Sequence, residues 1–318
     1  MKTYLIVLLI LALAEWLYMP VARRLGITAP VTSRSMHKGS PVTGAGIVFV
    51  FGAIAFAVIN HSIIDIQWIY VLVGGFVLSI VSFADDIRPL PPLPRLILQI
   101  LVLCLAFKSY CYPQALHIFF LAVVCGICCV NAFNFIDGIG GMLAFYGIVV
   151  LGTLLFAVSM YCGEYCELLT SLTALLLVAA IVFTAFNLGD RAFAGDVGAI
   201  TLGFFVAVII LKLILSSGDI TLVTLIIVVL FDTCITALHR LFAGENVLQP
   251  HNFNIYQVLA GKWKLTHLSV SLGYASLQLV ISAVYLLLPV YAHMIYLLLV
   301  ISLLMVVYVV IRRSPRSV

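Results

Sequence analysis

Long apolar runs separated by short polar segments dominate the pattern along the chain. A membrane-spanning helix needs about 20 mostly apolar residues. Eleven runs approach or reach that length, at residues 4–21, 44–59, 68–84, 96–110, 116–133, 142–160, 168–186, 198–215, 221–238, 268–288 and 292–311. The runs at 44–59 and 96–110 are the weakest, so ten spans is the alternative count. Unbroken runs of this kind predict an all-α polytopic membrane protein, because the strands of outer-membrane barrels instead alternate over about ten residues.

Composition supports the same class. Of the 318 residues, 64% are hydrophobic and 9% are charged, whereas soluble domains average about 45–50% apolar and about 25% charged residues. A soluble fold could not cover its surface with so few charges. We therefore expect one transmembrane domain over residues 1–318, without a soluble appendage. Disordered, collagen-like, coiled-coil and disulfide-stapled secreted classes are excluded.

Basic residues indicate the orientation in the membrane. Thirteen of the 16 Lys and Arg residues lie in the odd-numbered connections or the C-terminal tail; the exceptions are Lys2, Lys108 and Lys212. The positive-inside rule then places the N-terminus outside and the C-terminus in the cytoplasm. Ala12-Leu13-Ala14 resembles a signal-peptidase site, but cleavage there would put the positive charge on the outer face. An uncleaved first helix is expected.

Carboxylates and bases gather in the loops predicted to face the cytoplasm, at about 22–43, 84–95, 134–142, 187–197 and 239–267. Asp85, Asp86, Asp137 and Asp196 are hard oxygen ligands of the kind that Mg²⁺ prefers, and Mg²⁺ usually shares its coordination shell with substrate phosphates. Basic residues in the same loops indicate a polyanion beside the metal, as in phosphoryl transfer. Any one of these acids could instead be a helix N-cap. As a set they favour phosphoryl chemistry.

Five pieces of sequence between Arg34 and Gln257 carry a resemblance to a known family. They are Arg34-x-x-His37-Lys38 followed by Gly44-Ala45-Gly46, Asp85-Asp86 with Leu90, Arg95 and Gln99, Asn131-x-x-Asn134-Phe-x-Asp137-Gly138, Asn187 through Phe193-Ala-Gly195-Asp196-x-Gly198, and Pro250-His251 running into Tyr256-Gln257. In this order they resemble the polyprenyl-phosphate N-acetylhexosamine-1-phosphate transferases. This superfamily includes phospho-N-acetylmuramoyl-pentapeptide transferase and undecaprenyl-phosphate N-acetylglucosamine-1-phosphate transferase.

The resemblance implies a reaction and a place for it. Undecaprenyl phosphate would attack the β-phosphate of a UDP-activated N-acetylhexosamine, expelling UMP and leaving the sugar on a lipid diphosphate. The implied cofactor is Mg²⁺, with Mn²⁺ as an alternative. A bacterial cytoplasmic membrane protein with its active site facing the cytoplasm is implied, with no nucleic-acid partner and a homodimer as the candidate assembly.

Family roles carry over onto individual residues. The implied metal ligand is Asp196, and the implied catalytic residues are Asp85, Asp86 and Asp137. Whether one of the Asp85-Asp86 pair acts as a base, as an orienting group or as a covalent nucleophile stays open. The implied substrate-binding residues fall into two groups. The nucleotide side comprises Asn134, Gly138, Asn187 and Phe193, whose ring would stack on uracil. The contacts to the diphosphate are His37, Lys38, Arg191 and His251.

Departures from the family pattern narrow the choice of biosynthetic pathway. Gly140 occupies the place where the family often has a second acid, and Gly189-Asp190-Arg191 replaces a common Pro-Ala-Lys. The last loop lacks the His cluster of the peptidoglycan enzyme and carries Asn254 where the O-antigen branch tends to have a second His. These features favour initiation of a surface polysaccharide, of the O-antigen or capsule type, over peptidoglycan synthesis. The leading donor sugars are N-acetylglucosamine and 6-deoxy-N-acetylhexosamines.

A secondary transporter or lipid flippase is the alternative from another class. Its mark would be ionisable groups within the spans, for which Glu15, Lys212 and Asp232 are the candidates. We expect Glu15 and Asp232 near helix ends and a snorkelling Lys212, all with structural roles. The charge concentrated in the loops favours the enzyme.

Three cysteines imitate a metal-binding spacing. Cys125, Cys128 and Cys129 lie within an apolar run without a nearby His, so we interpret them as buried small hydrophobic residues.

Overall fold

The computed structural model describes residues 2–29, 40–111, 116–162, 166–189, 191–247, 249 and 253–314. Its helices are α1 (Lys2–Arg24), α2 (Ile47–Ile59), α3 (Ile66–Ile87), α4 (Pro92–Cys111), α5 (Leu116–Phe135), α6 (Met142–Tyr161), α7 (Cys166–Asn187), α8 (Gly195–Ser217), α9 (Ile227–Phe242), α10 (Ile255–Gln257), α11 (His267–Leu287) and α12 (His293–Arg313). Each of the eleven predicted runs coincides with helix. The run at 221–238 begins as a 3₁₀ segment, η2 (Ile220–Ile226), before α9. The all-α prediction is confirmed for the described residues.

Membrane-spanning character follows from the lengths of these helices. Within the described ranges, nine helical segments are long and apolar enough to cross a membrane. Of the two weakest predicted runs, the one at 44–59 forms α2, which has only 13 residues, and the one at 96–110 forms α4, which is not among the nine. The chain is therefore a multi-pass membrane protein.

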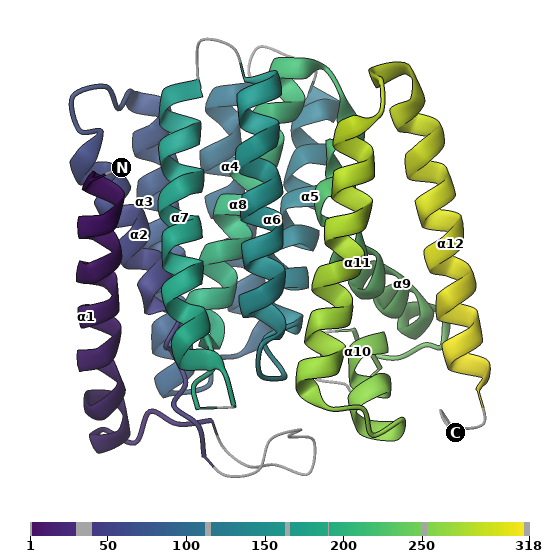
Figure 1. The fold of residues 1–318 in the computed structure, drawn as a ribbon, viewed down its shortest axis with the longest axis horizontal. Helices are drawn as coiled ribbons and strands as arrows, with labels where there is room; N and C mark the ends of the chain where they lie inside the picture. The colour runs from purple at the N-terminus through teal and green to yellow at the C-terminus, as the bar shows by residue number, and fades with distance from the viewer. Residues whose placement is uncertain are drawn as a thin grey trace.

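Helix α8 is the centre of the bundle. Its sequence is apolar on all sides, which is typical of a helix surrounded by other helices. It packs against α5, α3, α6, α2 and α7, and most of its residues are buried. Figure 1 shows α8 enclosed between its neighbours, and the chain segments that lead into its first turn lie at the same end of the bundle as the C-terminus. We call this end, where α3 ends and α8 begins, the site end.

A short extended segment joins three parts of the chain at the site end. The Ala29 N–H donates to the Pro41 carbonyl over 2.8 Å, and the Phe193 N–H donates to the Val42 carbonyl over 2.8 Å. Val42 forms isolated bridges with Thr28 on one side and Ala192 on the other. The segment therefore holds Ala29 and Pro41 beside the residues that enter α8.

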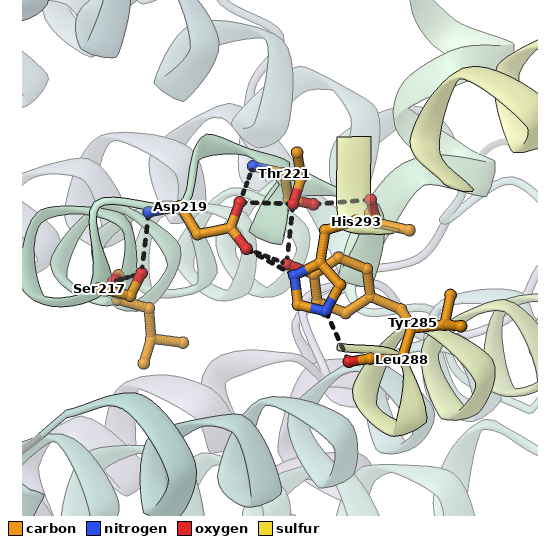
Figure 2. A network of polar contacts seen from close by, with 8 residues as sticks. Ser217, Asp219, Thr221, Tyr285, Leu288 and His293 are labelled. Atoms are coloured by element: carbon orange, nitrogen blue, oxygen red, sulfur yellow. Dashed lines mark hydrogen bonds and ion pairs between the residues drawn. The ribbon is translucent and has the colours of Figure 1, made fainter. Parts of the chain in front are cut away.

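A buried polar network lies at the opposite end of the bundle (Figure 2). Asp219, in the turn between α8 and η2, accepts hydrogen bonds from Thr221 and Tyr285 and pairs with the His293 ring over 2.7 Å. The His293 and Tyr285 rings stack with their centroids 4.1 Å apart. This network holds the turn after α8 against α11 and α12.

The ionisable groups within the spans do not lie where we expected. Glu15 is buried near the middle of α1, and neither of its carboxylate oxygens has a hydrogen-bond partner among the described residues. Asp232 also lies in the middle of its span, where it accepts hydrogen bonds from the Ile255 N–H and the Tyr274 hydroxyl. The predicted positions near helix ends are therefore wrong for both acids. The Lys212 ammonium lies 4.2 Å from the centre of the Trp68 ring.

The three sequence-adjacent cysteines differ in their surroundings. Cys129 is buried, as expected, and its thiol donates to the Gly203 carbonyl over 3.5 Å. Cys125 is exposed and Cys128 is half-buried, so the expectation of a buried hydrophobic residue is wrong for Cys125 and incomplete for Cys128.

Candidate active site

Two carboxylates, one in the last turn of α3 and one in the turn after α5, cap the first turn of α8. The Asp137 oxygens accept from the N–H groups of Ala194 and Gly195 over 3.1 and 2.7 Å. The Asp86 oxygens accept from the N–H groups of Asp196 and Val197 over 2.9 and 3.0 Å. Four successive backbone donors that a helix leaves without partners are thus satisfied from outside it. The two acids also face the positive end of the helix dipole.

Gly195 makes this capping sterically possible. Its φ is +70°, a conformation that glycine adopts without the cost paid by other residues. A Cβ atom at Gly195 would lie 2.5 Å from an Asp86 oxygen. Any larger residue would push the carboxylate away from α8.

Asp85 and Asp196 share one arginine. The Arg95 guanidinium, from the first turns of α4, contacts a carboxylate oxygen of each acid through Nη1. Asp85 also accepts from the Leu90 N–H, which closes the turn between α3 and α4. The side chains of Asp85, Arg95 and Asp196 are 8%, 28% and 23% exposed, so the ion pairs lie in a partly buried setting where charges interact more strongly than in water.

Asp85 and Asp196 are the pair suited to a metal ion. Among the described residues, no cluster of three or more His, Cys, Asp or Glu side chains is arranged to hold one. Mg²⁺, however, is usually bound by only one or two carboxylates and completes its shell with water and substrate phosphate oxygens. Asp85 and Asp196 give a two-carboxylate donor set of this kind, whereas the carboxylates of Asp86 and Asp137 each accept two backbone N–H groups.

Asp137 is the most strongly perturbed acid outside the spans. Burial raises the pKa of its carboxyl to about 8, and the negative charge of Asp86 adds to that rise. The hydrogen bonds from Ala194 and Gly195 oppose it. A cation bound nearby would favour the ionised form.

The Asn187 side chain links the 136–141 turn, which contains Asp137, to the 191–194 segment, which leads into α8. Its side-chain oxygen accepts from the Gly141 N–H, and its amide nitrogen donates to the Ala192 carbonyl, both over 2.7 Å. The side chain is buried. Asn187 therefore fixes the positions of the 136–141 turn and the 191–194 segment relative to each other.

A cavity of about 450 Å³, lined by both apolar and polar side chains, opens beside Arg95. Helices α4, α5 and α9 and the segment after α9 form its wall, and Asn134 contributes to it together with Gln99, Asn131 and Gln257. The Asn131 amide donates to the Gln99 side-chain oxygen over 3.0 Å. The motif residue Asn134 thus lies on the cavity side, whereas Asp137 lies against α8.

Tyr256 fixes the turn that contains Gly138. Its hydroxyl donates to the Phe135 carbonyl. A Cβ atom at Gly138 would come within 2.7 Å of the same hydroxyl. The close approach explains why glycine occupies this exposed position.

Arg191 and Phe193 are the remaining predicted substrate contacts that the structure describes. Arg191 is exposed at the site end, whereas the Phe193 side chain is only 5% exposed. Stacking of Phe193 on uracil stays a prediction. His37, Lys38, Asp190 and His251 fall outside the described residues.

Sequence reasoning gave Arg95 no role. The arginine was visible only as a family-pattern residue ten positions after Asp85, at the start of the next run. Its place between two acids depends on how α3, α4 and α8 pack.

Comparisons with known proteins agree with the motifs. The model of glycosyl transferase family 4 matches residues 68–214, a range that contains Asp85, Asp86, Asp137 and Asp196. A relative in Bacillus subtilis (strain 168), a probable undecaprenyl-phosphate N-acetylglucosaminyl 1-phosphate transferase, is 21% identical over 257 residues, covering 75% of this chain and 71% of the relative. These matches support the superfamily that the motifs resemble and, in general terms, a transferase.

Proposed function

We propose that the protein transfers an N-acetylhexosamine 1-phosphate from a UDP-sugar to undecaprenyl phosphate and releases UMP. The observation that carries the proposal is the convergence of Asp85, Asp196 and Arg95 from α3, α8 and α4 on one partly buried point at the site end. Two carboxylates and one guanidinium are what a metal ion and a diphosphate need around them. The name of the Bacillus subtilis relative supports the lipid acceptor.

The residues act mainly by positioning. An oxygen of the lipid phosphate attacks the β-phosphorus of the UDP-sugar, a new P–O bond forms, and UMP leaves with the electron pair of the broken bond. The attacking phosphate is already anionic at neutral pH, so it needs charge neutralisation and orientation more than deprotonation. Arg95 would supply positive charge to the diphosphate, and Asp86 and Asp137 would keep the first turn of α8 in place.

Asp85 and Asp196 would hold Mg²⁺, with Mn²⁺ as an alternative. The ion would neutralise the charge that develops on the phosphate oxygens. The distribution of Lys and Arg supports a cytoplasmic location of the site, where UDP-sugars are available. We assign the product to the start of a surface polysaccharide, because the last loop lacks the His cluster of the peptidoglycan enzyme.

The test is a reconstituted reaction. Purified protein is incubated with undecaprenyl phosphate, Mg²⁺ and one UDP-sugar at a time, and UMP and the lipid product are measured. We expect UMP with UDP-N-acetylglucosamine or a 6-deoxy-N-acetylhexosamine donor, and none after EDTA. The Asp196→Asn variant is the matched control. Absence of UMP with every donor would refute the proposal, and EDTA-insensitive solute movement would favour a transporter.

A further inference from the structure

Asp232 anchors the segment 253–257, which contains α10, to the interior of the bundle. Its carboxylate accepts from the Ile255 N–H over 2.8 Å and from the Tyr274 hydroxyl of α11 over 2.9 Å. The residue is only 3% exposed. An acid buried within a membrane span is costly unless it is hydrogen-bonded. The contacts of Asp232 therefore give this acid a role in holding the segment.

Arg312, near the end of α12, holds the other side of the same segment. Its guanidinium donates through Nη2 to the Phe253 carbonyl. The guanidinium carbon lies 5.7 Å from the centre of the Phe253 ring and 5.3 Å from that of Tyr308. Both distances are within the range of about 6 Å over which a cation attracts an aromatic ring. Figure 1 shows α10 at the same end of the bundle as the C-terminus, which follows α12.

The anchored segment forms part of the cavity wall. Asn254 and Gln257 line the cavity together with Arg95 and Asn134. The Asn254 N–H donates to the Gln257 side-chain oxygen over 3.1 Å, which ties the two residues to each other. A shift of the segment would move both amide side chains at once.

The segment also contacts the end of α5. The Tyr256 hydroxyl donates to the Phe135 carbonyl, and the Tyr256 ring packs edge-on against Tyr274 with the centroids 6.5 Å apart. Phe135 directly follows Asn134, which lines the cavity. Displacement of 253–257 would therefore disturb the cavity wall on two sides.

The polar part of this wall suits a sugar joined to a phosphate. Arg95 is the one charged side chain among the described residues of the wall. Amide groups both donate and accept hydrogen bonds, as the hydroxyl and N-acetyl groups of a sugar require, and a guanidinium suits a phosphate. Six residues of the wall carry amides: Gln99, Asn131, Asn134, Gln249, Asn254 and Gln257.

We propose that Arg312 and Asp232 are positioning residues for the sugar donor, because they fix the segment that presents Asn254 and Gln257 to the cavity. The inference rests on the proposed transfer reaction. Both side chains contact the segment and not the described wall of the cavity. Their loss should therefore weaken binding of the UDP-sugar and leave the transfer step unchanged.

Arg312→Leu is the test variant, because Arg312 lies at the end of the last helix and outside the bundle core. Purified full-length protein is given undecaprenyl phosphate, Mg²⁺ and UDP-N-acetylglucosamine, or the 6-deoxy donor if only that one supports UMP release. We expect the KM for the UDP-sugar to rise about tenfold, the order expected for loss of one charge-assisted hydrogen bond. The kcat and the KM for undecaprenyl phosphate should not change.

Two further variants separate the contact from the charge. Arg313→Leu is the matched control: it removes the same charge from the next residue of α12, which is exposed, and should leave the donor KM unchanged. Arg312→Lys keeps a cationic donor for the Phe253 carbonyl and should restore most of the donor affinity.

Hydrogen–deuterium exchange tests the anchor without any turnover. Arg312→Leu should speed exchange of the backbone amides of residues 253–258, and Arg313→Leu should not. Asp232→Asn leaves one acceptor oxygen for two donors, so it should speed exchange most at the Ile255 amide.

The possible outcomes separate the inference from the proposed function. An unchanged donor KM in Arg312→Leu, or an equal rise in Arg313→Leu, would overturn the positioning role. A rise confined to the KM for undecaprenyl phosphate would overturn the assignment to the donor. If the unsubstituted protein releases no UMP, the proposed function fails, and unchanged exchange in Arg312→Leu would then refute the anchor by itself.

Discussion

The Asp86 carboxylate accepts a hydrogen bond from the backbone N–H of Asp196 over 2.9 Å, so the acid at the end of α3 holds the first turn of α8. The neighbouring acid, Asp85, instead contacts Arg95. Two adjacent carboxylates therefore have different surroundings: one satisfies backbone donors, and the other faces a cation. We expect their substitutions to differ in kind.

Removal of the Asp86 carboxylate should destabilise the protein. Asp86→Ala leaves the N–H groups of Asp196 and Val197 without their acceptor, and we expect a loss of about 1–2 kcal/mol, as for other helix caps. The measurement is thermal unfolding of the detergent-solubilised protein. Asp65→Asn is the control, because Asp65 caps α3 through the Trp68 N–H and asparagine caps equally well. An unchanged unfolding midpoint in Asp86→Ala would contradict the capping role.

Substitution of the Arg95-linked acids should act on catalysis. Asp85→Asn and Asp196→Asn each remove a negative charge from the candidate metal pair, so we expect UMP release to be abolished while membrane insertion is unchanged. Any residual activity should need a higher Mg²⁺ concentration than that of the unsubstituted protein. Near-normal turnover in either variant, with the usual Mg²⁺ dependence, would remove these assignments.

Arg95 should not be replaceable by lysine. A lysine keeps the charge but lacks the planar set of donors with which arginine contacts two acids. We expect Arg95→Lys to lower the transfer rate by at least about tenfold, which corresponds to about 1.4 kcal/mol. Arg88→Lys, at the exposed residue that ends α3, is the control and should remain active. Equal rates in the two variants would show that Arg95 acts only as a point charge.

The sequence predicted the elements well because apolar runs of membrane length leave few alternatives to helix. It also predicted the acids as a group, since Asp85, Asp86, Asp137 and Asp196 are concentrated in a chain with few charges. The sequence could not show which groups each acid contacts. Asp86 and Asp137 meet α8 through contacts between residues 57 or more positions apart, and such contacts are set by packing rather than by local pattern.

The orientation of the bundle can be tested with single cysteines in a cysteine-free background. Ser62 lies in the exposed turn between α2 and α3, and Ser314 follows α12. The positive-inside rule predicts that a membrane-impermeant maleimide labels Ser62→Cys in intact cells but labels Ser314→Cys only after permeabilisation. The reverse pattern would invert the topology and place the candidate site outside.

The Asp219 network should make stability depend on pH at the acidic end. Burial raises the pKa of the Asp219 carboxyl, but hydrogen bonds from Thr221, His293 and Tyr285 outweigh that effect and hold the pKa below its usual value of 3.8. The fold therefore favours the ionised acid, and the resulting stability is fully present above that value and is lost as pH falls through the lower, folded-state pKa. Asp219→Asn should lower the unfolding temperature near neutral pH, because hydrogen bonds to a charged group contribute about 1.5–3 kcal/mol. The difference from the unsubstituted protein should shrink as pH is lowered from about 6 to about 3. Asp65→Asn is the control at another helix start, and a difference that stays constant with pH would show that the Asp219 charge contributes nothing to folding.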